Sequence, residues 1–114
     1  MNKNRRKRLT RVVGSLESLS GELPRLKIET TLSESQTEVE VIADEEQDAL
    51  DALPENLAFS QQADNMNDNV SDLCDASSDL ETALSEFRDE QKEYSDVEDD
   101  VGSAIDSIQN AIDR

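Results

Sequence analysis

Carboxylates are the residues of this 114-residue chain whose type and spacing could do chemistry. Acidic residues three or four positions apart lie on one side of a helix, with Cβ atoms roughly 5–6 Å apart. General acid–base catalysis needs two carboxylates in unlike, partly buried settings, and nothing in the sequence separates one of these acids from the next. We therefore interpret the row as a protein-binding face without catalytic residues. Its members are Asp64, Asp68, Asp72, Asp75, Asp79, Glu86 and Glu90, and Glu93 continues it.

Most other site chemistries are excluded by composition. The chain has no His, one Cys and three Gly, so it lacks the residues for His-based catalysis, a Cys/His zinc site, a disulfide framework or a glycine-rich phosphate loop. A calcium loop starting at Asp96 would need Gly at its sixth position and Glu at its twelfth, where the chain has Val101 and Ser107. We expect no enzyme activity, no metal and no cofactor. Cys74 is interpreted as a small, partly buried residue in a reducing cytoplasm.

The charge of the chain is sorted by position. The net charge is −17, yet residues 1–13 carry six cations and no acid, which leaves −23 for the remainder. Three interpretations stay open for the acids: a solvated surface, adaptation to high salt, or imitation of DNA phosphates for a protein that normally binds DNA. The basic segment either contacts nucleic acid or folds against the acidic body, and we favour the second. No stretch is apolar enough for a membrane span.

A short helix is predicted for the N-terminal segment. Leu9, Val12, Leu16 and Leu19 recur at spacings of three and four, which is typical of an amphipathic helix. Gly21 and Pro24 follow, so we expect the helix to end near Ser20.

Residues 25–42 change period. Leu26, Ile28 and Leu32 alternate with polar residues, and Val39 and Val41 do so after a polar link at residues 33–36. This pattern favours a β-hairpin inserted between helices. One more amphipathic helix is the competing interpretation. A second helix is then expected over Asp44 to Leu53, where Pro54 ends it.

The last half of the chain carries a heptad repeat, which predicts one helix over residues 61–113, about 80 Å long. We expect a kink in the Asp96–Gly102 region, because Gly is poor in helices and adjacent Asp residues repel. A helix of that length needs a covered apolar face, so the repeat predicts a homodimer. The expected oligomer seam is Leu73, Leu80, Leu84, Phe87, Ile105 and Ile108.

One part of the chain resembles a group of small acidic helical-hairpin proteins of bacteriophages and prophage-carrying bacteria. The likeness rests on Asp44-Glu45-Glu46 ahead of Leu53-Pro54-Glu55-Asn56-Leu57, and on the basic start of the chain; residues 2–19 and 44–87 fit the scheme. Segment 25–42 interrupts what is usually one helix, and residues 58–62 replace the usual turn. The resemblance implies a phage-linked accessory protein, with no activity or binding residues to transfer.

The sequence thus predicts a mainly α protein with three segments: a basic N-terminal helix (1–20), a β-hairpin or linker (21–43), and an acidic helical hairpin or coiled coil (44–114). The leading functional hypothesis is a phage or mobile-element protein that inhibits a basic, DNA-handling host protein by presenting a DNA-like acidic face, an anti-defence role in the host cytoplasm. The alternative is an assembly protein whose seam drives oligomerisation. We expect no direct binding of nucleic acid, membrane or small-molecule substrate.

Overall fold

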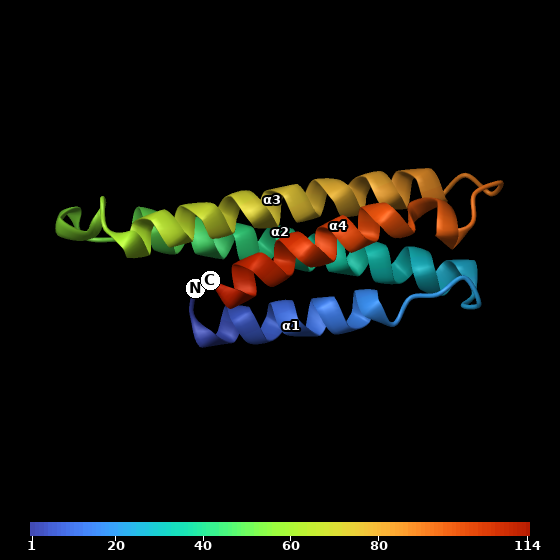
Figure 1. The fold of residues 1–114 in the computed structure, drawn as a ribbon, viewed down its shortest axis with the longest axis horizontal. Helices are drawn as coiled ribbons and strands as arrows, with labels where there is room; N and C mark the ends of the chain where they lie inside the picture. Colours follow the sequence, from blue (N-terminus) through green and yellow to red (C-terminus); the bar gives the residue numbers. More distant parts are fainter.

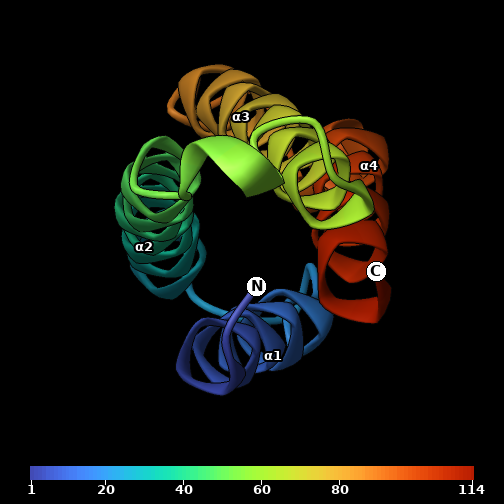
Figure 2. The same cartoon turned by 90° about the vertical axis from the view of Figure 1, so that its left-hand side faces the viewer.

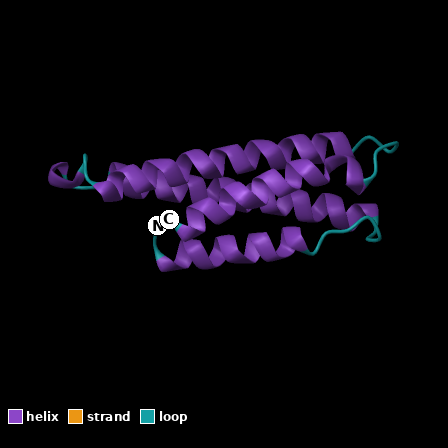
Figure 3. Ribbon diagram, in the orientation of Figure 1, coloured by secondary structure: helices purple, strands orange, loops and turns teal.

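Four amphipathic α-helices run alternately up and down along one axis in the computed structural model, which describes all 114 residues (Figure 1, Figure 3). Seen along that axis, the helices follow one another around a ring, so that α1 lies diagonally opposite α3 (Figure 2). The predicted mainly α fold class is confirmed. The elements are α1 (Lys3–Glu17), α2 (Arg25–Asp51), the 3-10 turn η1 (Glu55–Leu57), α3 (Gln61–Phe87) and α4 (Tyr94–Asp113).

Side-chain caps define where three of the helices begin. The Asn2 side chain accepts a hydrogen bond from the Arg5 backbone N–H at 2.8 Å, and the Ser60 hydroxyl accepts one from Ala63 at 3.2 Å. Glu93 and Asp96 form a reciprocal capping box at the start of α4. Each cap satisfies backbone donors that the first helical turn would otherwise leave unpaired.

The prediction of a β-hairpin over residues 25–42 is wrong: this stretch and the predicted helix after it form one continuous helix, α2. Its buried positions step by three and four, as a helix requires, and three of them are the polar or charged residues Thr31, Ser35 and Glu46. Leu26, which helped to suggest alternation, is 74% exposed. Packing against α1 and α3 has outweighed the local preference of β-branched residues for strands.

The single long helix predicted for residues 61–113 is also wrong. The chain turns back between Phe87 and Tyr94, and the Asp96–Gly102 region, where we expected a kink, lies inside α4. The capping box at Glu93 starts a new helix there, so the two halves of the heptad repeat face each other within one chain. The helix that ends near Ser20 and the break at Pro54 were predicted correctly.

The repeat residues fill the core of the bundle. Leu73, Leu80, Leu84, Phe87 and Ile108 are buried in a cluster of 22 residues that draws on all four helices, and Ile105 packs against its edge. The apolar face that seemed to need a second copy is therefore covered by α1 and α2 of the same chain.

A charged cluster closes this core where the termini meet. Glu46 is fully buried; Arg5 lies 3.2 Å from one of its oxygens, and the Asn69 amide donates to the other at 2.8 Å. Arg114 donates to Asn69 and so joins the end of α4 to the cluster. Beyond this level α2 and α3 continue as a two-helix hairpin with Phe59 exposed near its tip (Figure 1).

Arg25 holds the opposite end. Its guanidinium donates hydrogen bonds to the backbone carbonyls of Phe87, Asp89 and Lys92, and it stacks 4.0 Å from the centroid of the Phe87 ring. These carbonyls belong to the last turn of α3 and to the turn after it, where helical partners are missing. One side chain of α2 thereby fixes the reversal between α3 and α4.

Replacing Arg25 with Gln should lower the free energy of unfolding by about 2 kcal/mol, because charged hydrogen bonds to otherwise unpaired carbonyls are lost. Urea unfolding followed by circular dichroism measures this. Arg88→Gln, at an exposed cation in the same turn, is the matched control and should change the value by less than about 0.5 kcal/mol. Equal effects of the two variants would contradict the role given to Arg25.

Replacing Leu80 with Ala should cost about 3 kcal/mol of unfolding free energy, because a fully buried side chain leaves a cavity. Thermal melts of the parent protein at several protein concentrations should coincide, as expected for a core made by one chain. A melting temperature that rises with protein concentration would instead favour the seam as an interface between copies.

Candidate functional site

The acidic row predicted from the sequence follows one edge of α3, on the side of α4. Six of its seven members lie on α3, and Glu90 lies in the turn that follows. Core residues occupy the other side of the same helix, so the carboxylates are directed outward. Asp64, Asp68, Asp75, Glu86 and Glu90 are exposed, whereas Asp72 and Asp79 are partly buried.

Asp72 differs from the rest of the row because it has a cation. The guanidinium of Arg114 lies 2.7 Å from its carboxylate. Since Arg114 also donates to Asn69, Asp72 is part of the cluster that closes the core. Its charge is therefore largely compensated within the chain.

Asp79 lies at the centre of an uncompensated group of carboxylates. Burial raises the pKa of Asp79 above its ordinary value, and the nearby charges of Asp100 and Asp75 raise it further. The ion pairs of the chain involve other carboxylates, on Glu38, Glu45, Glu46 and Asp72. Three acids from two helices thus meet without a cation between them; we call Asp75, Asp79 and Asp100 the acidic face.

Asp100 was missed as a site residue in the sequence. It lies in the region that was expected to break the helix, and only the reversal at residues 88–93 brings it beside α3. The signal that could have found it is the Glu93–Asp96 pair, whose spacing of three fits a capping box. A helix starting there would have to return along α3.

Six of the eleven cations of the chain lie on α1, away from the acidic face. Arg8 of α1 lies 2.7 Å from Glu38 and 2.7 Å from Glu45 of α2, and its hydrogen bond lowers the pKa of the Glu45 carboxyl. The basic segment therefore lies against the acidic body, as the sequence analysis favoured. Lys3, Lys7 and Arg11 remain exposed on α1, which is diagonal to α3 (Figure 2).

Several further findings bear on what the site can do. No group of three or more acidic or Cys side chains is arranged to hold a metal ion. No helix has the length and apolar character that crossing a bilayer requires. Cys74, expected to be partly buried, is exposed.

Comparison with protein-family models, curated proteins and solved structures found no match to the chain.

Replacing Asp79 with Asn should stabilise the protein at pH 7 by about 0.5 kcal/mol, because repulsion from two neighbouring acids is removed. The raised folded-state pKa of Asp79 means that folding favours its protonated form. Its penalty is thus absent below the unfolded-state pKa, near 3.9, and grows as the pH rises through the folded-state pKa.

Melting temperatures from pH 3 to 7 test this prediction. The variant should melt about 2 °C higher at pH 7, and the difference should vanish at the acidic end of the range. Glu81→Gln removes one exposed acid from the middle of the same helix, at a position with no acid three or four residues away, and should produce a smaller effect. A stabilisation by Asp79→Asn that does not change with pH would contradict the assignment.

Proposed function

We propose that this protein is a non-enzymatic binding protein that captures a basic, nucleic-acid-handling protein on the acidic side of α3 and α4. The observation that carries the proposal is the meeting of Asp75, Asp79 and Asp100 without a cation. Like charges at such spacing destabilise a fold by a few tenths of a kcal/mol per pair. Folding alone does not explain why the chain keeps three repelling acids together. A partner that supplies cations at this place would turn the repulsion into attraction.

The shape and charge of the molecule support a likeness to DNA. The protein is a rod with principal extents of 53, 20 and 17 Å. Its net charge of −17 along a 53 Å axis is one negative charge per ~3 Å, about half the linear charge density of duplex DNA, which carries one per ~1.7 Å of axis. A groove that binds DNA through Lys and Arg side chains would meet charge of the same sign here, at a lower density.

The proposed role follows from the partner. A phage or mobile element that encodes such a protein would use it in the host cytoplasm to inhibit a DNA-handling host protein, such as a defence nuclease. Electrostatic capture should be fast and should weaken steeply with salt, because attraction between exposed charges is screened within about 8 Å at physiological ionic strength.

Capture from a bacterial host lysate, at about 50 mM and about 500 mM salt, tests the proposal. The parent protein should retain a nucleic-acid-binding protein at low salt only, and duplex DNA should compete for it. A variant with Asp75, Asp79 and Asp100 all changed to Asn should retain at least about tenfold less.

A matched control separates the acidic face from overall acidity. Asp44, Asp48 and Asp51 are exposed on α2, and changing all three to Asn removes the same charge from another surface. This control variant should bind the partner almost as well as the parent. Equal losses in the two triple variants, or a captured partner that does not bind nucleic acid, would rule the proposal out.

A further inference from the structure

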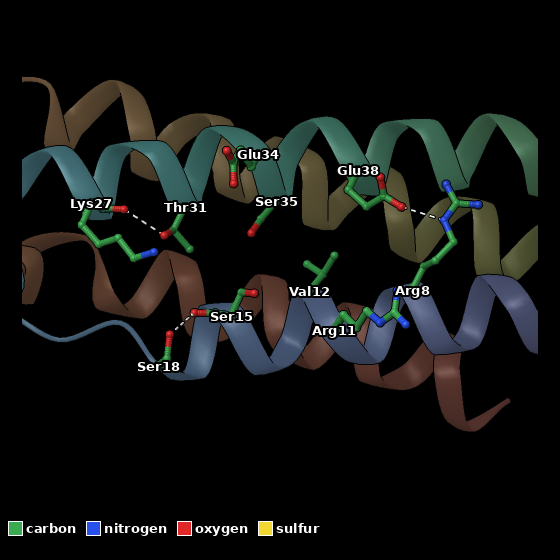
Figure 4. Close-up of a pocket in the computed structure, with 10 residues that line it drawn as sticks. All are labelled: Arg8, Arg11, Val12, Ser15, Ser18, Lys27, Thr31, Glu34, Ser35 and Glu38. Atoms are coloured by element: carbon green, nitrogen blue, oxygen red, sulfur yellow. Dashed lines mark hydrogen bonds and ion pairs between the residues drawn. The ribbon is translucent and has the colours of Figure 1, made fainter.

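A second surface of the molecule is the groove between α1 and α2 (Figure 4). Its volume is about 470 Å³, and of its ten lining residues only Val12 is hydrophobic. Grooves of a few hundred Å³ are the size that small-molecule ligands occupy in proteins. The polar lining is unusual for two neighbouring helices of a bundle, which normally pack apolar side chains between them.

The two ends of this groove carry cations that the protein does not use. Arg11 comes from α1 and Lys27 from α2, and both side chains are exposed. The ion pairs of the chain are made by Arg5, Arg8, Arg114 and the amino terminus. In the close-up, Lys27 and Arg11 lie on opposite sides of Ser15 and Ser35 (Figure 4). Two anionic groups, one at each end, would satisfy them.

The middle of the groove offers hydroxyl groups. Ser15 and Ser35 face each other across it, and the hydroxyl of neither takes part in a hydrogen bond within the protein, although Ser35 is only 5% exposed. Ser15 is exposed, and the Ser35 hydroxyl reaches the solvent in the groove, so both hydroxyls are free to hydrogen-bond with a ligand that has hydroxyls of its own. Glu34 adds an exposed carboxylate to the lining as an acceptor.

Apart from the exposed carboxylate of Glu34, the remaining charges near the groove are already compensated. Glu38 accepts a hydrogen bond from Arg8 at 2.7 Å, and Arg8 is held by Glu45 as well. The repulsion that a protein of net charge −17 exerts on an anion is screened over about 8 Å at physiological salt. Arg11 and Lys27 would contact the ligand directly and thus dominate its binding.

We propose that the α1–α2 groove binds a small sugar bisphosphate, with one phosphate at Arg11, the other at Lys27, and the sugar hydroxyls against Ser15 and Ser35. Charge-assisted hydrogen bonds to phosphate are the strong contacts in this arrangement. From the sequence, we expected no small-molecule substrate. The fold changes that expectation by placing Arg11 of the basic segment across from Lys27. This site does not depend on the function proposed for the acidic face.

Isothermal titration calorimetry at physiological salt, with fructose 1,6-bisphosphate as the probe, tests the proposal. Fructose 6-phosphate should bind about tenfold more weakly, because one phosphate contact is missing, and fructose should give no measurable binding. In two-dimensional NMR spectra, the bisphosphate should shift the backbone amide signals of Ser15 and Ser35 more than those of α3. A bisphosphate that binds no tighter than the monophosphate overturns the proposal.

Three variants with the same change of charge locate the site. Arg11→Gln and Lys27→Gln should each reduce the affinity for the bisphosphate about tenfold, towards that of the monophosphate. Lys7→Gln, at an exposed position of α1 outside the groove, should change it less than about twofold. All three positions are exposed, and circular dichroism checks that the variants fold. A Lys7 variant that weakens binding as much as the other two would show non-specific attraction to α1 and overturn the assignment.

Discussion

The reversal between α3 and α4 is the constraint on which the rest of the molecule depends. Arg25 reaches across from the start of α2 and donates to the carbonyl of Phe87 at the end of α3 and to that of Lys92 in the turn after it, while the Glu93–Asp96 capping box begins the next helix. A continuous helix would leave the second half of the heptad repeat uncovered, since apolar faces must be buried. The reversal gives that repeat a partner within the chain, and it also places Asp100 beside Asp79.

The spacing of apolar residues in the sequence was sufficient to predict the buried faces of α1, α3 and α4, because those faces depend on local spacing alone. Most apolar positions of the repeat between Leu73 and Ile108 are buried as expected, and the breaks between helices fell where Pro24 and Pro54 lie. The sequence could not show whether residues 25–42 form strands or a helix. β-Branched residues favour strands locally, whereas the contacts that stabilise the helix come from other helices. The turn at residues 88–93 was missed since the heptad register continues through it without a slip.

A candidate site within one helix was predicted from the sequence, whereas sites formed by two helices were missed. The acidic row on α3 follows from spacing within one helix, so the sequence was sufficient to find it. Asp100 and the α1–α2 groove depend on which helices become neighbours. The spacing of Glu93 and Asp96 could have indicated the reversal that brings Asp100 beside α3, but no spacing in the sequence indicates the groove. Hydroxyl residues such as Ser35 were passed over because a polar residue at a core position is recognised only when the core is known.

The diagonal placement of basic α1 and acidic α3 has a consequence for how the molecule approaches other charged bodies. Positive charge on one long side and negative charge on the other give the rod an electric dipole moment across its width, in addition to its net charge. In the field of a basic surface such a body experiences a torque, which turns α3 and α4 forward and α1 away before contact. Encounters would then begin from a narrow range of orientations, and the α1–α2 groove would stay open to solvent while α3 and α4 are occupied.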